Sequence, residues 1–129
     1  MGLLQPHARR HDGVDGGEVA LAVAWAILFV AGLCEIAWAV GLKYTDGFTR
    51  PVPTALVVIA MTASVWLLAI ALRTIPLGTG YAVWTGIGAV GTAVLGMFLF
   101  NESRDVLRVG CILLIVAGIV GLKLVTPGS

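Results

Sequence analysis

Long stretches without charged residues limit the fold of this chain more than any other feature. Residues 51–72 and 74–101 contain no charged side chain, and residues 19–42 contain a single one. A helix needs about 20 apolar residues to cross the roughly 30 Å hydrocarbon core of a bilayer. Each of the three stretches is long enough, so we expect each of them to cross a membrane as a helix.

A fourth spanning helix is expected near the C-terminus. Residues 109–122 are uncharged, and the segment reaches the required length if it begins near Val106 and if Lys123 extends its ammonium group to the membrane surface. These are continuous apolar runs without period-two alternation, which disfavours a β-barrel. The sequence therefore predicts an all-α membrane protein with four transmembrane helices, near residues 21–43, 52–72, 77–100 and 106–125.

The composition agrees with a lipid environment and excludes several functions. Hydrophobic residues make up 59% of the 129 residues and charged residues 12%, about half the charged share of a soluble domain. A soluble chain of this size cannot bury so much apolar surface. The net charge of +1 leaves no basic face for nucleic acid. Nothing in the sequence forms a nucleophile–base pair, a metal site or a cofactor motif, so no enzyme, metal or cofactor is indicated.

Residues 1–20 differ in character from the rest of the chain. They are polar and include several glycines and Pro6, which oppose regular structure. We expect a disordered N-terminal tail there, followed by one four-helix transmembrane domain over residues 21–126. His7 and His11 lie four residues apart, but in a flexible tail they do not constitute a metal site.

Glu35 is the charged residue inside the first expected helix, in the segment GLCEIAW. A charged side chain at this depth is costly, so it is expected to face protein or a water-filled cavity and to mark a functional site. Lys123 lies at a helix end, so no intramembrane cation offers a fixed partner. Desolvation favours the protonated carboxyl group, whereas an arriving cation favours the carboxylate. Holding either a proton or a cation is the minimum chemistry of proton-coupled cation antiport. The structural alternative is a protonated glutamic acid that bonds neighbouring helices.

Small and aromatic residues share predicted helix faces with Glu35 or with each other. Gly32 and Trp38 lie three residues before and after Glu35, on one stripe of the helix. The glycine leaves room beside the carboxylate, and the indole N–H can donate to it. Aromatic faces on the third helix can accept cations, and a tyrosine hydroxyl can bond a carboxylate. The second helix adds a hydroxyl near its middle. We therefore expect Gly32, Trp38, Ser64, Tyr81 and Trp84 to line a site around Glu35.

A second copy of the chain is expected to complete this site. Four short helices are too few to enclose a path through a bilayer. A single carboxylate also gives a monovalent cation few ligands. Lys and Arg are balanced between the two ends of the helices, which gives no preferred orientation. That balance is either uninformative or a sign that the chain inserts both ways and pairs as an antiparallel homodimer. The four basic residues at one end are Arg9, Arg10, Arg73 and Lys123, and the four at the other are Lys43, Arg50, Arg104 and Arg108.

Several ordered motifs resemble the small multidrug resistance family over about residues 22–126. They are AGLCEIAWAVGLKYTDGFTR, IPLGTGYAVWTGIGAVG and ILLIVAGIVGLKL. The resemblance implies antiparallel dimers in the bacterial inner membrane that export cations in exchange for protons. Trp38 to Lys43 and the GLKL segment that contains Lys123 are similar to the guanidinium-exporter branch. It implies that Glu35 binds both proton and substrate, that the five residues lining the expected site hold the carboxylate, and that Lys123 is a marker of the branch.

The sequence leaves several functions in competition. The first is a proton/guanidinium antiporter, because guanidinium is planar, charged and rich in N–H donors that a carboxylate binds. The nearest alternative is an exporter of quaternary ammonium or other hydrophobic cations, against which Trp38 argues. A dual-topology anion channel ranks lower, since Glu35 repels anions. A non-transporting membrane assembly subunit also ranks lower.

Overall fold

The computed structural model describes the backbone of residues 5–126 and the side chains of residues 16–126. The described chain forms four α-helices, and all four are long and apolar enough to cross a membrane. This confirms the prediction of an all-helical protein with four candidate spans. The helices are α1 (Gln5–Tyr44), α2 (Pro51–Ala71), α3 (Leu77–Leu99) and α4 (Val106–Val125).

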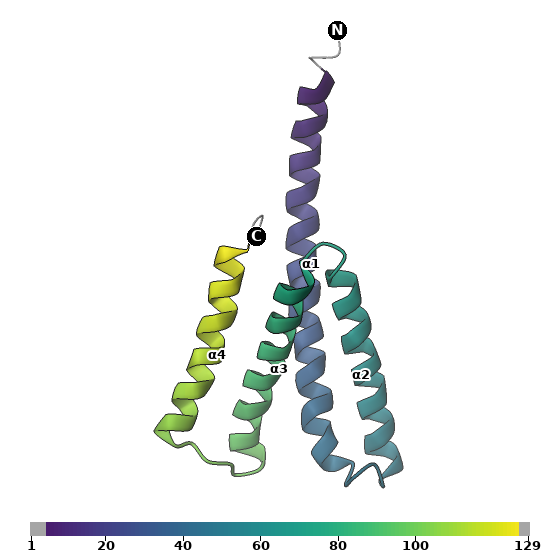
Figure 1. Ribbon diagram of the computed structural model, residues 1–129. Coiled ribbons are helices and arrows are strands. Elements are labelled where there is room, and N and C mark those ends of the chain that lie inside the picture. The colour runs from purple at the N-terminus through teal and green to yellow at the C-terminus, as the bar shows by residue number, and fades with distance from the viewer. Residues whose placement is uncertain (1–4, 127–129) are drawn as a thin grey trace.

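The last three helices lie within one residue of their predicted bounds, whereas α1 is much longer than expected. It begins at Gln5, and Figure 1 shows its N-terminal part extending well beyond the other helices. The sequence predicts a disordered tail there, so the structure differs from that prediction over residues 5–20. A helix that is already nucleated propagates one residue at a time, and each glycine within it costs only about 1 kcal/mol. The continuous helix is therefore physically possible despite Gly13, Gly16 and Gly17.

The connection from α1 to α2 depends on local backbone chemistry. Thr45 is buried; its hydroxyl donates to the Leu42 carbonyl at 2.7 Å and accepts from the Phe48 N–H at 3.2 Å. Gly47 has a positive φ of 69°, which glycine adopts without steric cost. Pro51 occupies the first position of α2, where its missing N–H leaves no helical bond unmade. The short turn therefore sends α2 back alongside α1.

Helix packing divides the molecule into a three-helix unit and a peripheral helix. Helix α1 packs against α2 and α3, while the backbone of α4 approaches only that of α3 among the described helices. Figure 1 shows α4 at the edge of the bundle, away from α1 and α2. The buried core comes from α1, α2, α3 and the α2–α3 connection, and α4 contributes no buried residue. The members of this core are Ala24, Leu28, Ala31, Leu68, Ala71, Ile75, Val83 and Trp84.

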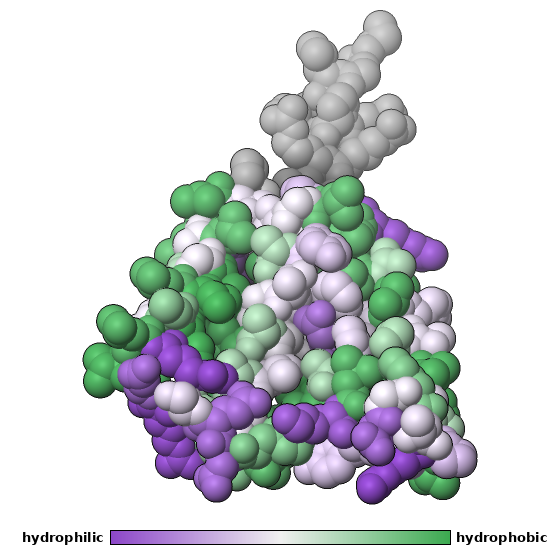
Figure 2. All heavy atoms as spheres, turned by 60° about the horizontal axis from the view of Figure 1, so that its bottom comes forward, coloured by the Kyte–Doolittle hydropathy of each residue, from purple (hydrophilic) through white to green (hydrophobic). Residues whose placement is uncertain are grey.

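The two short loops at one end of the bundle, together with the helix turns beside them, carry most of the described charges. Figure 2 brings this end forward and shows hydrophilic side chains gathered there, with apolar side chains over much of the bundle above them. Arg108 at the start of α4 forms an ion pair with Glu102, with 2.9 Å between Nη2 and Oε1. Lys43 lies over the Phe100 ring at 5.1 Å. Charged groups at the helix ends and apolar sides are the pattern expected of a protein that spans a bilayer.

Candidate functional site

Glu35 lies in the membrane-spanning part of α1, and its carboxyl group packs directly against Gly88 of α3. A Cβ atom added to Gly88 would overlap the Glu35 side chain, so the missing side chain creates the space that the carboxyl group occupies. Oε1 of Glu35 is buried and has no hydrogen-bond partner in the described part of the chain. The carboxyl group is therefore held by packing, and one of its oxygens is left for a further partner.

Ser64 connects the three packed helices one turn away from Glu35. It is 0% exposed, and its hydroxyl donates to the Ala31 carbonyl of α1 at 2.7 Å. The Trp84 indole of α3 donates to the same hydroxyl oxygen at 3.0 Å. Ala31 and Trp84 each precede by four residues the positions of Glu35 and Gly88, which is about one helical turn. These two bonds fix the rotation of α1, α2 and α3 beside the carboxyl group.

The other expected site residues have fewer polar partners within one chain. Gly32 is buried against Ile87, since a Cβ added there would lie 2.6 Å from Cγ2 of that residue. The Trp38 Nε1 is buried without a hydrogen-bond partner among the described residues. The expected bond from Trp38 to Glu35 is therefore not formed within the chain. Tyr81 is 54% exposed, and its ring centroid lies 5.6 Å from that of Trp84.

Lys123 lies beside Trp25, which precedes Glu35 by ten residues along α1. Its Nζ is 4.3 Å from the centroid of the Trp25 ring, a cation–π distance. The structure therefore brings Gly32, Ser64 and Trp84 into the helix seams beside Glu35 but places Lys123 elsewhere. Gly88, which makes the closest contact with Glu35, is missing from the expected site; its only sequence signal is the glycine-rich run of the third helix.

Together these features define a multi-pass membrane protein with a carboxyl group at a glycine-lined seam between its spanning helices. The unpartnered polar atoms of Glu35 and Trp38 and the exposed ring of Tyr81 leave the site incomplete within one chain. Such groups inside a membrane mark pathways for ions or protons. The class that fits this arrangement is a small membrane transporter.

Comparison with known proteins agrees with that class. The family model described as small multidrug resistance protein matches residues 23–115. The chain is 57% identical over 102 residues to a guanidinium exporter of Yersinia pestis, covering 79% of this chain and 98% of the relative. It is 55% identical over 104 residues to a guanidinium exporter of Escherichia coli K12, covering 81% of this chain and 99% of the relative. The chain belongs to the small multidrug resistance family, and these relatives confirm its resemblance to the guanidinium-exporter branch.

Proposed function

We propose that this chain exports guanidinium in exchange for protons, working as an antiparallel homodimer in a bacterial inner membrane. The observation that carries the proposal is the buried, unpartnered Oε1 of Glu35 in a membrane-spanning helix. The names of the similar exporters supply the substrate. Because exporters are transport proteins, the same names favour transport over an enzymatic role.

Glu35 has the chemistry that exchange requires. The ion pair found among the described residues joins Arg108 to Glu102 and leaves Glu35 without a cationic partner in that part of the chain. A neutral carboxyl group tolerates the low-dielectric surroundings, while a carboxylate needs a counter-ion. Guanidinium supplies that counter-ion and binds a carboxylate through paired N–H donors. A proton and guanidinium therefore compete for Glu35, and this competition couples their movements.

The surrounding side chains support a small polar site. Ser64 and Trp84 hold the helices in a fixed rotation, and Gly32 permits close packing beside the carboxyl group. Trp38 and Tyr81 retain groups that can bond a carboxylate or a cation. In the proposed site Glu35 binds proton and substrate, while Gly32, Trp38, Ser64, Tyr81 and Trp84 line it and orient the carboxylate.

A second copy supplies what one chain lacks. Two Glu35 residues around a shared site coordinate the cation more completely than one. Helix α4 contains no buried residue, so it has a free face for association. The balance of Lys and Arg between the two ends supports insertion in both orientations, and hence an antiparallel pair.

The deciding experiment measures proton movement in proteoliposomes that contain the purified protein and a guanidinium gradient. We expect the gradient to drive protons in the opposite direction, and Glu35→Gln to abolish this movement while the protein still inserts. The matched control is Glu18→Gln, which removes an exposed carboxylate near the start of the first span and should retain wild-type exchange.

Two results would count against the proposal. Undiminished exchange by Glu35→Gln would remove its mechanism. Stronger proton coupling to tetrapropylammonium than to guanidinium would assign the chain to the quaternary ammonium exporters instead.

A further inference from the structure

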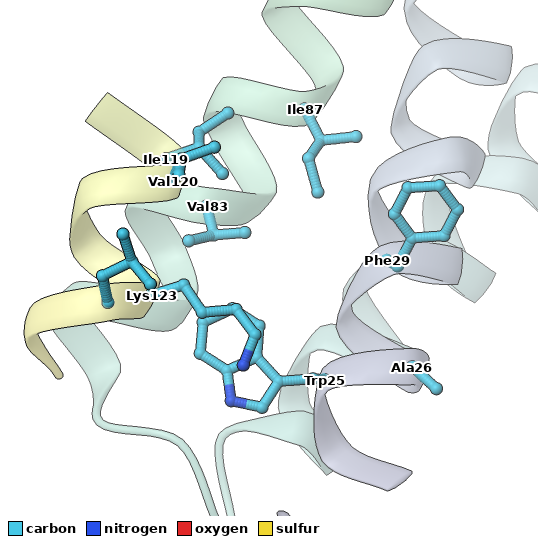
Figure 3. A pocket seen from close by; sticks show the side chains of 9 residues that line it. Trp25, Ala26, Phe29, Val83, Ile87, Ile119, Val120 and Lys123 are labelled. Atoms are coloured by element: carbon cyan, nitrogen blue, oxygen red, sulfur yellow. The ribbon is translucent and has the colours of Figure 1, made fainter. Parts of the chain in front are cut away.

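A cavity lies between α1, α3 and α4. Its volume is about 730 Å³, within the usual range for a small-molecule site. Figure 3 shows Trp25 and Phe29 from α1, Val83 and Ile87 from α3, and α4 side chains around it. The Glu35 carboxyl group is not among its lining residues. The complete lining consists of Trp25, Ala26, Phe29, Val83, Ile87, Ile119, Val120, Lys123 and Leu124.

The polar side-chain atoms of this lining are all donors. Lys123 supplies an ammonium group above the Trp25 ring, and Trp25 supplies an indole N–H that has no hydrogen-bond partner in the described chain. The other seven lining residues are apolar. The lining side chains offer guanidinium no hydrogen-bond acceptor, so the cavity does not suit that cation. Its chemistry suits a molecule with an anionic head and a long apolar tail.

The position of the two donors matches the surface of a bilayer. Lys123 lies in the last turn of α4, where a lysine side chain reaches the headgroup region. Tryptophan is enriched at the same depth. Because the backbones of α4 and α1 do not approach each other closely, the gap between these two helices is bridged by side chains, among them Lys123 and Trp25. A lipid in the surrounding bilayer can therefore reach it from the side.

We infer that this cavity binds an anionic phospholipid, with the phosphate at Lys123 and one acyl chain among the apolar side chains. Basic pockets between transmembrane helices attract anionic headgroups by direct charge complementarity. The apolar lining adds the contact area that a freely diffusing lipid lacks. The inference concerns lipid binding and does not depend on which cation the protein exports.

The test compares spin-labelled phosphatidylglycerol with spin-labelled phosphatidylcholine in bilayers that contain the purified full-length protein. Electron paramagnetic resonance gives the immobilised fraction of each lipid. We expect the wild type to prefer phosphatidylglycerol by about fivefold, the contribution of roughly one basic side chain near an anionic lipid. Lys123→Gln should remove this preference and Lys123→Arg should keep it. The matched control, Arg73→Gln, removes an exposed cation at the same end of the bundle that does not line the cavity.

A second pair of variants tests the apolar part of the cavity. Ala26→Trp should fill it and lower the immobilised phosphatidylglycerol fraction although Lys123 is present. Ala69→Trp makes the same change at an exposed position on α2 outside the lining and should have no effect. Equal losses from Lys123→Gln and Arg73→Gln would mean diffuse surface attraction and would overturn the inference. The inference would also be overturned if the wild type showed no lipid preference and Ala26→Trp altered dimerisation. A second chain, and not a lipid, would then cover the cavity.

Discussion

Helices α3 and α4 both contain several glycines but use them differently. On α3, Gly86, Gly88 and Gly91 lie against side chains of neighbouring helices, and a Cβ at any of them would collide. On α4, a Cβ added at Gly110, Gly118 or Gly121 would meet nothing within 4 Å. These three glycines of α3 are occupied by contacts within the chain, whereas the three of α4 are open.

The difference shows which helix has its small-residue face covered by other helices of the same chain and which has that face uncovered. Helix α3 lies between α1 and α4 and contributes buried residues, while α4 contributes none. Small residues in transmembrane helices let a second helix approach closely. The open small-residue face of α4 therefore favours it as the contact with a second copy, and the filled glycines of α3 shape the site around Glu35.

The largest effect is expected from a methyl group at Gly88. Gly88→Ala places a Cβ in the space of the Glu35 side chain, so the carboxyl group must turn away from its position. The turned carboxyl group would lose a hydrogen bond to bound guanidinium. The loss of one hydrogen bond to a charged group weakens binding by about 10- to 100-fold, and guanidinium exchange in proteoliposomes should fall by that amount. Gly78→Ala, on the same helix with nothing within 4 Å, should retain wild-type exchange. Unchanged exchange by Gly88→Ala would show that this contact does not position Glu35.

A second prediction concerns the stability of the three-helix unit. Ser64→Ala removes a buried hydroxyl that bonds both Ala31 and Trp84, and it leaves the Trp84 N–H without a partner. A buried donor left unsatisfied costs about 1–3 kcal/mol. Reversible unfolding in mixed micelles should show this loss. Thr62→Ala is the control, because its exposed hydroxyl bonds only to Val58 of the same helix. Equal stability of the two variants would show that Ser64 does not fix the helix rotation.

The sequence predicts the spans well because charged residues are excluded from the bilayer core and so mark where each span ends. The bounds of α2, α3 and α4 follow from where Arg50, Arg73 and the 102–108 cluster interrupt the apolar runs. Side-chain partners are harder, since they depend on how each helix is rotated about its axis. The sequence therefore singles out Ser64 but not its bonds to Ala31 and Trp84, and it overlooks the contact between Gly88 and Glu35. The sequence also gives no sign that α1 begins as early as Gln5, because the polar, glycine-bearing segment at the start of this helix has weak intrinsic helix preference.

A smaller effect is expected from enlarging the open face of α4. Gly118→Val fills a position with no neighbour in the chain, so it should leave the monomer intact. If α4 forms the contact with a second copy, the added methyl groups overpack that contact at a cost of about 1–3 kcal/mol. Dimer affinity in bilayers, measured by energy transfer between labelled chains, should fall by about tenfold. Val116→Leu, nearly opposite on the helix, should leave the affinity unchanged. Equal affinities of the two variants would place the dimer contact on another surface.

The last prediction asks whether the partner of α4 is an inverted copy. In a chain with Cys34→Ala and Cys111→Ala, a reporter cysteine replaces exposed Thr49 in the α1–α2 turn without changing any charge. Because the sequence distributes four Lys and Arg residues toward each end of the helices, neither orientation is favoured. A membrane-impermeant thiol reagent applied from each side of the membrane should therefore label comparable fractions. Adding Thr74→Lys beside Arg73 adds one cation to the opposite end and should shift the distribution, which a fixed orientation would not do. Labelling from one face only would exclude the antiparallel dimer, and the open face of α4 would then require a parallel copy or a different membrane protein.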